Sequence, residues 1–384
     1  MAEKRYLIVG GGMTGHAAAQ AIRELDPRGE ITILGAEPHP PYARPPLSKA
    51  LWKGQAEDSV WLPQVANLEL LSGRRAASID RKAHAVADDR GNSHAYDKLL
   101  LATGGAPRRL QFGGDRVVYF RTVDDYRKIR GNAGKRAVVI GGGFIGSEMA
   151  AALSLDGRQV TMVFPEDGIC ARAFPKDLVD FVTGYYREKG VQVLTNDVPV
   201  AISDSGSVRT KSGRDLAADV VIGGLGIVPE TQLAEAAGLT VRDGIVVDAQ
   251  LRTNDPDIYA AGDVARFHSE VLGKDVRVEH EDNANTMGKL AGQAMAGAPI
   301  TWRHVPMFYS DLFDLGYEAV GEIDSRLETF ADWKVPFREG VVYYLRDGRV
   351  RGVLLWNTWG QVDNARALLA EPGPHRDLKG RLPR

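Results

Sequence analysis

Two stretches of the chain repeat the same order of apolar and polar positions. Each starts with a short apolar run, continues through a glycine-rich turn into an alanine-rich segment of helical character, and reaches a second run rich in β-branched residues. This order predicts strand, turn, helix and strand, twice over. The predicted strand, helix and strand cover residues 6–9, 16–25 and 30–34 in the first stretch and 137–140, 147–156 and 159–164 in the second.

The pattern changes in the last third of the chain. Residues 258–261 form an apolar run that predicts a buried strand ending at Gly262-Asp263. Residues 341–356 alternate between apolar and polar positions around Asp347-Gly348, which is a strong hairpin signal. A helix is predicted near residues 362–370, and the Pro- and Arg-containing tail after Glu371 is expected to be loosely ordered.

These elements predict the α/β fold class, with two Rossmann-like nucleotide-binding domains and a C-terminal α+β domain. A chain of 384 residues exceeds the size at which one hydrophobic core usually stops growing, so several domains are expected. Rossmann-like signals resume after the middle of the chain, which predicts that the second nucleotide domain is inserted into the first. The predicted boundaries are 1–114 and 241–300 for the first domain, 115–240 for the second and 301–384 for the third.

The composition of the chain limits the classes of binding partner that are expected. Hydrophobic residues make up 44% of the chain and charged residues 26%, as in ordinary globular proteins, and the formal net charge is −2. No global basic field therefore favours nucleic acid or an anionic membrane, and no apolar run reaches the roughly 18–20 residues of a membrane span. Cys170 is the only cysteine, which excludes an internal disulfide and a metal site of several thiolates. With no targeting segment at the N-terminus, these features favour a cytoplasmic protein without a structural metal.

The two glycine-rich turns carry the most specific chemistry. In G-x-G-x-x-G the first glycine allows a tight bend, the second lets the main chain approach a pyrophosphate, and the third lets helix and strand pack closely. The helix start then offers free N–H groups to the phosphates. One such turn can be only a tight connection, but two in the correct context predict two dinucleotide sites. The glycines are Gly10, Gly12 and Gly15 in the first turn and Gly141, Gly143 and Gly146 in the second.

Longer motifs around these turns resemble a known superfamily. IVGGGMTG (8–15), PYARPPLSK (41–49), YDKLLLATGGAPR (96–108), VVIGGGFIGSE (138–148) and YAAGDVA (259–265) together resemble the FAD-containing pyridine-nucleotide oxidoreductases. VFPEDG (163–168), RVEHEDNA (277–284), MFYSDL (307–312) and YYLRDGRVRGVLLWN (343–357) resemble its branch of apoptosis-inducing factor and bacterial ferredoxin reductases. The resemblance runs from about residue 5 to 375.

The resemblance assigns FAD to the first turn, where Gly10, Gly12 and Gly15 would hold its pyrophosphate. Arg44 and Lys49 would lie along the FAD, and Thr103, in the third motif, would be a further ligand. Asp263 would bind the ribityl chain; its alternative role is the N-cap of a following helix. Relatives place an acid for the adenosine ribose where this chain has Ala36, so either Glu37 reaches the ribose or that contact is lost.

The second turn would serve NADH. The resemblance makes Glu166 the ligand of the nicotinamide nucleotide's ribose, and a carboxylate at this place accepts from a free 2′-OH and repels a 2′-phosphate. Arg172 matches a basic position that contacts the nucleotide in relatives, although it could also be a solvated surface charge. NADH is therefore the expected reductant.

The resemblance also implies residues for hydride transfer. Lys49 and Glu148 would meet beside the flavin N5, whereas the alternative for Glu148 is an acid in the first turn of a helix. Phe144 would be a gate that moves aside for the nicotinamide, or it only fills a domain interface.

Three further residues are implied near the rings. Glu279 and His280 match positions near the carboxamide and the flavin pyrimidine edge, where His280 or the helix start behind it could counter charge. A lone histidine is more often structural than catalytic. Tyr309 stands where the animal apoptosis factors carry a tryptophan.

Together these features predict an FAD-dependent NADH oxidoreductase of the ferredoxin reductase type without dithiol chemistry, because paired redox cysteines are missing. The electron acceptor stays open between a ferredoxin- or rubredoxin-type iron–sulfur protein and a quinone. The alternative is an NADH-responsive redox sensor, in which dimerisation or partner binding matters more than turnover. A homodimer is possible in either case.

Overall fold

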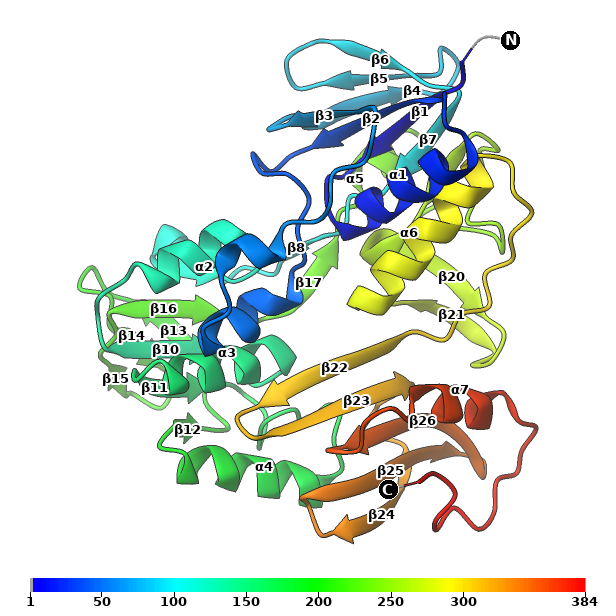
Figure 1. Cartoon of the computed structure of the whole chain (residues 1–384). Coiled ribbons are helices and arrows are strands. Elements are labelled where there is room, and N and C mark those ends of the chain that lie inside the picture. Colours follow the sequence, from blue (N-terminus) through cyan, green and yellow to red (C-terminus); the bar gives the residue numbers. More distant parts are fainter. Residues whose placement is uncertain (1–2, 384) are drawn as a thin grey trace. The chain divides into compact units, whose positions relative to one another are not determined.

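The computed structural model describes residues 3–383 and divides into two compact units, each built from three segments (Figure 1). Unit 1 takes Met1–Ala43, Val60–Ala106 and Val228–Pro306, and unit 2 takes Arg44–Ser59, Pro107–Ile227 and Met307–Arg384. The short strands β8 (Gly105–Pro107) and β17 (Ile227–Pro229) span two of the points where the chain passes from one unit to the other. The boundaries of three separate domains stay a prediction.

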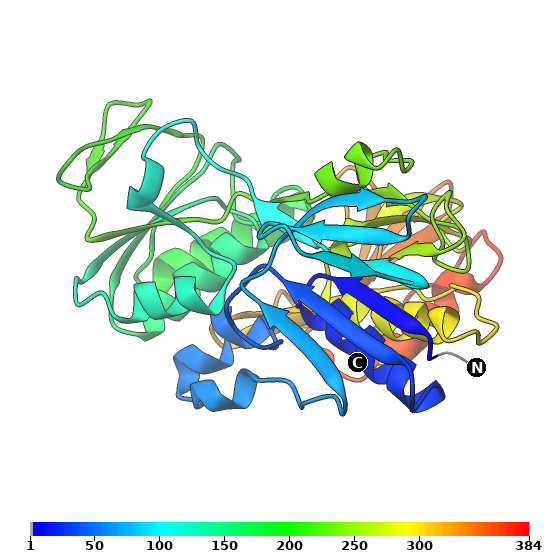
Figure 2. The same ribbon diagram turned by 90° about the horizontal axis from the view of Figure 1, so that it is seen from above.

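Unit 1 is centred on a five-stranded parallel sheet with the order β19-β7-β1-β2-β3. The helices α1 (Met13–Leu25) and α6 (Glu281–Met295) lie side by side against it, and Figure 2 shows the blue strands and α1 from above. Apolar side chains of the sheet and both helices, such as Ile8, Ile22 and Met287, form one buried core. The strands are β1 (Arg5–Val9), β2 (Glu30–Gly35), β3 (Leu68–Ser72), β7 (Lys98–Leu101) and β19 (Ile258–Ala260).

Small residues let α1 and α6 approach closely. A Cβ on Gly288 would lie 2.4 Å from the carbonyl oxygen of Thr14, and one on Gly292 would lie 2.3 Å from that of Ala18. Any larger residue at these two positions would push the helices apart. The glycines of α6 therefore allow it to pack closely against the alanine-rich face of α1.

Two small sheets and a short helix complete unit 1. One sheet is an antiparallel meander. In the other sheet the middle strand pairs in parallel with one neighbour and antiparallel with the other. The elements are β4 (Ala76–Asp80), β5 (Ala85–Asp88) and β6 (Ser93–Ala95) in the meander, β18 (Ile245–Val246), β20 (Ala265–Ser269) and β21 (Lys274–Arg277) in the second sheet, and α5 (Gln232–Ala236).

Unit 2 contains a second five-stranded parallel sheet, with the order β12-β11-β10-β16-β9, and a small antiparallel sheet. The parallel strands are β9 (Val117–Tyr119), β10 (Arg136–Ile140), β11 (Gln159–Val163), β12 (Gln192–Leu194) and β16 (Val220–Gly223); the small sheet has β13 (Pro199–Ile202), β14 (Val208–Thr210) and β15 (Asp215–Leu216); the helices are α2 (Val123–Arg130), α3 (Phe144–Leu155) and α4 (Lys176–Glu188).

The repeat seen in the sequence extends to the topology. The first strand of each β-α-β unit, β1 or β10, lies at the centre of its sheet and pairs in parallel with the strand that follows the helix. Both sheets thus present the end of a central strand, a glycine turn and a helix start at the same place, which is the dinucleotide-binding arrangement. The predicted α/β class with two Rossmann-like parts is confirmed.

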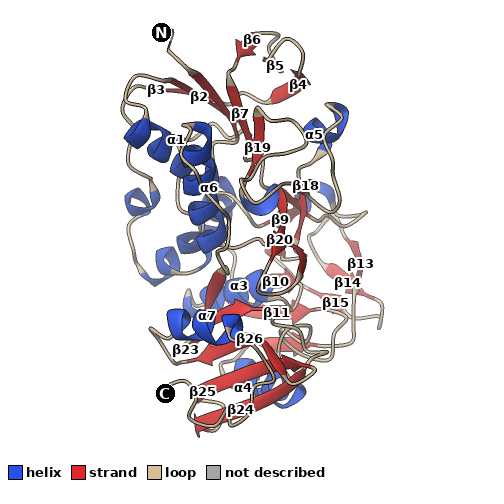
Figure 3. Cartoon of the chain, turned by 90° about the vertical axis from the view of Figure 1, so that its right-hand side faces the viewer, coloured by secondary structure: helices blue, strands red, loops and turns tan. Residues whose placement is uncertain are grey.

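The C-terminal part of unit 2 is a five-stranded antiparallel sheet with the order β22-β23-β26-β25-β24, with α7 (Val362–Ala370) packed on β23 and β26 (Figure 3). The hairpin predicted at Asp347-Gly348 joins β25 and β26, and both turn residues have positive φ (52° and 70°), as a two-residue hairpin turn requires. The strands are β22 (Met307–Leu312), β23 (Leu315–Gly321), β24 (Glu328–Val335), β25 (Glu339–Arg346) and β26 (Arg349–Trp356).

Three expectations from the sequence are corrected. Both Ala-rich helices begin three residues earlier than predicted, at Met13 and Phe144, because the second glycine of each motif is the N-cap and the third lies inside the first turn. No long helix follows Asp263: a single 3₁₀ turn leads directly into β20. Asp263 is therefore not the N-cap of an α-helix.

The third correction concerns the tail after Glu371, which is packed rather than loose. The backbone N–H of Val350 donates to Nδ1 of His375 (2.9 Å), and that of Gly380 donates to the carboxylate of Asp332 (2.6 Å). Leu378 and Leu382 are buried. These contacts with distant strands hold the tail, and local composition carries no sign of them.

Within residues 3–383, no helix is both long and apolar enough to cross a bilayer.

Candidate functional site

The first glycine turn has the geometry of a pyrophosphate cradle. Gly10 has a φ of +125°, and a Cβ there would lie 2.1 Å from the carbonyl oxygen of Ala102, so only glycine fits. A Cβ on Gly15 would collide with the carbonyl oxygen of Gly10. At Gly12, by contrast, a Cβ would meet no protein atom within 4 Å. The close contacts explain the first and third glycines, and the open space at the second is where a phosphate can approach the backbone.

Asp263 lies beside this turn. The preceding residue, Gly262, has a φ of +78°, and a Cβ on it would lie 2.3 Å from Oγ1 of Thr14 in the first turn of α1. Arg277 donates one bond to the carbonyl oxygen of Asp263 (3.1 Å) and another to the carboxylate of Glu279 (2.7 Å). Unit 1 thus brings together the first glycine turn, Asp263 and Glu279, which are far apart in the sequence.

His280 is the N-cap residue of α6 and is partly buried. Burial lowers the pKa of its imidazole to about 4, against the opposing effect of the nearby Asp263 and Asp282. The ring is therefore neutral near pH 7, and the positive charge at this position comes from the start of α6.

Glu37 follows the end of β2 and Thr103 follows the end of β7, the two strands that lie on either side of β1 in the unit 1 sheet. The hydroxyl of Tyr42 donates to the Glu37 carboxylate (2.5 Å), and the hydroxyl of Thr103 donates to the carbonyl oxygen of Glu230 (2.7 Å). Whether Glu37 binds a ribose stays a prediction.

The second glycine turn repeats the first. Gly141 has a φ of +120°, with a hypothetical Cβ 2.3 Å from the carbonyl oxygen of Gly224, and a Cβ on Gly146 would lie 2.1 Å from the carbonyl oxygen of Gly141. Gly143 again faces open space. Glu166 lies just beyond the end of β11, where a Rossmann fold places its ribose carboxylate, and Arg172 forms an ion pair with it at 2.6 Å. The side chain of Arg172 is 86% exposed.

Glu148 is the centre of a buried polar cluster in unit 2. One carboxylate oxygen accepts from the hydroxyl of Ser310 (2.6 Å); the other accepts from the hydroxyl of Ser48 (2.6 Å) and from the ammonium group of Lys49 (2.8 Å). Because α3 begins at Phe144, Glu148 is the fifth residue of the helix and is not in its first turn. The explanation by the helix dipole is therefore wrong.

Aromatic rings surround this cluster. The ammonium group of Lys49 lies 5.2 Å from the ring centre of Tyr309, whose side chain is exposed. Phe144, at the start of α3, contacts Phe308 (5.0 Å between ring centres) and Tyr317 (6.3 Å). Unit 2 thus places the predicted residues Lys49, Glu148, Phe144 and Tyr309 within one group.

The segment that carries Lys49 is held firmly. Arg44 donates to the carbonyl oxygen of Arg121 (2.9 Å), and the indole of Trp52 donates to the carbonyl oxygen of Leu47 (2.7 Å) while its ring packs edge-on against Tyr126. The sequence pointed to Arg44 and Lys49 but not to Ser48 or Ser310. Both serines lie inside quoted motifs, yet a hydroxyl gives no signal of its partner 100 or 162 positions away.

Comparison with known proteins then decides the family. The sequence model of the family described as pyridine nucleotide-disulphide oxidoreductase matches residues 4–288, which is well over half of the chain. The chain belongs to this family. The model described as the C-terminal part of apoptosis-inducing factor, mitochondrion-associated, matches residues 291–336 and 333–371.

Relatives in this family match over nearly the whole chain. Apoptosis-inducing factor 1, mitochondrial, of Dictyostelium discoideum is 33% identical and is aligned over 97% of this chain and 80% of its own length. The ferredoxin–NAD(+) reductase component of the anthranilate 1,2-dioxygenase system of Burkholderia cepacia is 34% identical over 96% and 95%. The crystal structure of the covalent putidaredoxin reductase–putidaredoxin complex matches with a TM-score of 0.90, 31% identity and coverage of 96% and 94%.

These matches confirm the resemblance, the fold class and the enzyme class. The chain is an FAD-dependent NADH oxidoreductase. The two glycine turns fit this assignment, because the backbone at the second glycine of each turn faces open space. Each unit also has a carboxylate, Asp263 or Glu166, that can accept from the hydroxyl groups of a dinucleotide. The comparisons lend no support to the alternative of a redox sensor. The roles of single residues stay predictions.

Despite the name of the family, Cys170 has no chemistry of the disulphide type. It is the only cysteine and is buried, and burial raises the pKa of its thiol to about 12. Its sulfur lies 3.9 Å from the hydroxyl of Ser147, and its backbone N–H donates to the carbonyl oxygen of Gly142. Cys170 therefore supports the second glycine turn as a neutral packing residue.

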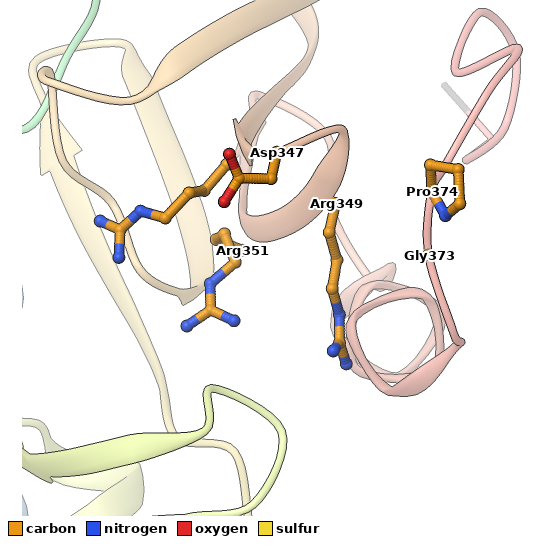
Figure 4. A pocket seen from close by; sticks show the side chains of 6 residues that line it. Asp347, Arg349, Arg351, Gly373 and Pro374 are labelled. Atoms are coloured by element: carbon orange, nitrogen blue, oxygen red, sulfur yellow. The ribbon is translucent and has the colours of Figure 1, made fainter.

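A pocket of about 380 Å³ opens beside the turn between β25 and β26 (Figure 4). Glu322 lies 3.3 Å from the guanidinium of Arg346 and 3.6 Å from that of Arg351, and Arg349 reaches the carbonyl oxygen of Leu369 in the last turn of α7. The positive charges thus have partners within the C-terminal sheet, and the pocket contains none of the predicted site residues. Its lining consists of Arg346, Asp347, Arg349, Arg351, Gly373 and Pro374.

Proposed function

We propose that this chain passes electrons from NADH to a ferredoxin-type iron–sulfur protein. Bound FAD supplies the chemistry, since it can take a hydride from NADH and release the electrons to an acceptor. The observation that carries the proposal is the buried ion pair of Lys49 and Glu148, held by hydroxyl groups and by no thiol, in a chain similar along almost its full length to ferredoxin reductases.

In this proposal the residues of the chain bind and orient the cofactors. Gly10, Gly12 and Gly15 hold the FAD pyrophosphate, with Arg44, Thr103 and Asp263 along the rest of the molecule, and either Glu37 reaches the adenosine ribose or that contact is lost. Gly141, Gly143 and Gly146 hold the NADH pyrophosphate, and Glu166 accepts from the ribose, with Arg172 beside it. Glu279 and His280 lie near the carboxamide and the flavin pyrimidine edge, Phe144 is the gate that moves aside for the nicotinamide, and Tyr309 lies where the animal apoptosis factors carry a tryptophan against the flavin.

Lys49 and Glu148 orient the reacting groups. A charged pair in a site without bulk water interacts strongly and needs no reorganisation during the reaction. Lys49 is 11% and Glu148 4% exposed, so this pair is dry. In the proposed role, Lys49 stabilises negative charge near the reacting atoms and Glu148 fixes the direction of the ammonium group.

The test is turnover with a panel of acceptors. Purified holoenzyme and NADH are combined separately with a ferredoxin, a rubredoxin, a quinone, ferricyanide and oxygen, with the cluster-free ferredoxin as the control. The proposal expects the highest kcat/KM with the ferredoxin. A faster reaction with the quinone would replace the acceptor class, and fast reduction by NADH followed by slow re-oxidation with every acceptor would favour the sensor.

The single cysteine also supports a cytoplasmic location, because a chain that cannot form an internal disulfide gains nothing from an oxidising compartment. A homodimer stays a second proposal, which the molar mass of the holoenzyme in solution, with and without NADH, tests directly.

A further inference from the structure

We propose that Ser48 and Ser310 are positioning residues that keep Glu148 ionised and aimed at Lys49. The inference deepens the proposed function and rests on it, since it concerns the same ion pair. It assigns a task to two serines that lie on segments distant in the sequence.

The hydrogen bonds have the form expected for an ionised carboxylate. A serine hydroxyl has a single proton, and a carboxylate only accepts. Both O–H···O distances are 2.6 Å, within the range of bonds to a charged acceptor. The other acceptor near the Ser48 hydroxyl, the carbonyl oxygen of Pro45, is 3.5 Å away, so the proton of Ser48 points to Glu148.

The two serines act on different oxygens. Ser310 donates to Oε1, whereas Ser48 and Lys49 share Oε2. The carboxylate is therefore held at both ends, which fixes its plane and the direction in which it meets the ammonium group. Ser310 is 0% and Ser48 6% exposed, so bulk water cannot replace a lost hydroxyl. Removal of either donor favours the protonated, uncharged form of Glu148.

Apart from Lys49, the ionisable side chains that face Glu148 stay neutral. Tyr186 of α4, Tyr317 of β23 and Cys170 face it, and burial raises the pKa of all three, to about 12 for Cys170 and well above the usual value for both tyrosines. Lys53 and Asp311, on the segments that carry the serines, form their own exposed ion pair at 2.7 Å. The two tyrosines and the thiol therefore add no charge beside the pair of Glu148 and Lys49.

The experiment compares Ser310→Ala and Ser48→Ala with wild type as holoenzymes. Infrared titration follows the C=O stretch of a protonated carboxylic acid, assigned to Glu148 by its loss in Glu148→Gln, and stopped-flow follows the pH profile of flavin reduction. The acid midpoint of both signals should move upward by about one pH unit, as loss of one hydrogen bond to a charged group predicts. Ser310→Ala should shift it more than Ser48→Ala, because Lys49 still serves the oxygen that Ser48 leaves.

Ser147→Ala is the matched control, because Ser147 is also buried in α3 but donates to the carbonyl oxygen of Phe144. Its midpoint should equal that of wild type. Unchanged midpoints in both serine variants, or an equal shift in Ser147→Ala, would overturn the inference. If one variant does not fold, the other decides, since the serines come from separate segments. The infrared signal reports protonation without any acceptor, so it stands or fails independently of the ferredoxin proposal.

Discussion

Glu148 illustrates how much of a residue's chemistry comes from its neighbours. In the sequence it is one acid in a helix rich in alanine, and its motif alone suggested a role. In the structure it is 4% exposed and bonded by three donors from two other segments. A buried charge that lacks partners is costly, so this carboxylate depends on the complete set.

Replacement of Glu148 by Ala should slow flavin reduction by NADH far more than it weakens NADH binding. Loss of one electrostatic group from a dry site typically costs about a hundredfold in rate. Stopped-flow reduction over a range of NADH concentrations separates the limiting rate from the dissociation constant. Asp311→Ala is the matched control, because its ion pair with Lys53 is exposed and should contribute little. An unchanged limiting rate in Glu148→Ala would remove Glu148 from the reaction.

Glu166 should set the choice of nucleotide. Wild type should have the higher kcat/KM with NADH, and Glu166→Arg should shift the ratio of NADH to NADPH values toward NADPH by at least about tenfold, because a guanidinium attracts a 2′-phosphate. Arg172, already 2.6 Å from Glu166, would add to that attraction. Asp167→Arg makes the same charge change one residue later and should leave the ratio nearly unchanged. A wild-type preference for NADPH would contradict the assignment.

At the scale of elements, the sequence pattern predicted helices and turns correctly where their structure depends on residues close together in the chain. The two glycine turns, the hairpin at Asp347-Gly348 and the helix Val362–Ala370 depend on short-range geometry, and all are present. The failures came where distant contacts decide. The strand β20 after Asp263 is selected by pairing with β18 and β21, and the tail is held by strands that precede it by many residues.

The two glycine turns should be separable by mutation. Gly12 and Gly143 have φ values of −89° and −83°, which any residue adopts, and an added methyl group meets no protein atom. Gly12→Ala should therefore fold but lose most of its FAD, whereas Gly143→Ala should keep FAD and bind NADH at least about tenfold more weakly. Released flavin and NADH titration measure both effects.

Gly184→Ala serves as the control for these variants, since Gly184 lies within α4 with open space around it. It should keep both ligands and gain about 1 kcal/mol of stability from the higher helix propensity of alanine. Loss of both ligands in either turn variant, or of neither, would show that the turns do not act separately.

The start of α6 leads to a prediction about pH. The pKa of His280 is about 4 in the folded protein, below the ordinary value of 6.5. Between these values the unfolded chain binds more protons than the folded one, so the free energy of unfolding should fall as pH falls from 6.5 to 4. His280→Asn should flatten this dependence in denaturant unfolding of the holoenzyme, whereas His268→Asn, on an exposed residue of β20, should not. Equal slopes in wild type and His280→Asn would contradict the prediction.

At the scale of the whole molecule, the route of electrons from FAD to the acceptor depends on two facts: the chain has no second cysteine, and its one thiol is buried. A relay by disulfide exchange needs a thiolate and a second cysteine, but Cys170 has no partner in the sequence, and burial holds its pKa at about 12, so it is a neutral thiol at working pH. Cys170→Ser should therefore retain FAD and turn over with every acceptor of the panel within about twofold of wild type. The substitution puts a more polar hydroxyl into a buried site, so a loss of stability of about 1 kcal/mol is expected and thermal unfolding is measured alongside. Cys170→Ala, which removes the polar atom, is the matched control. If both variants fold and bind FAD but are inactive with all acceptors, electrons pass through the thiol. The direct route from FAD to an external acceptor would then be wrong.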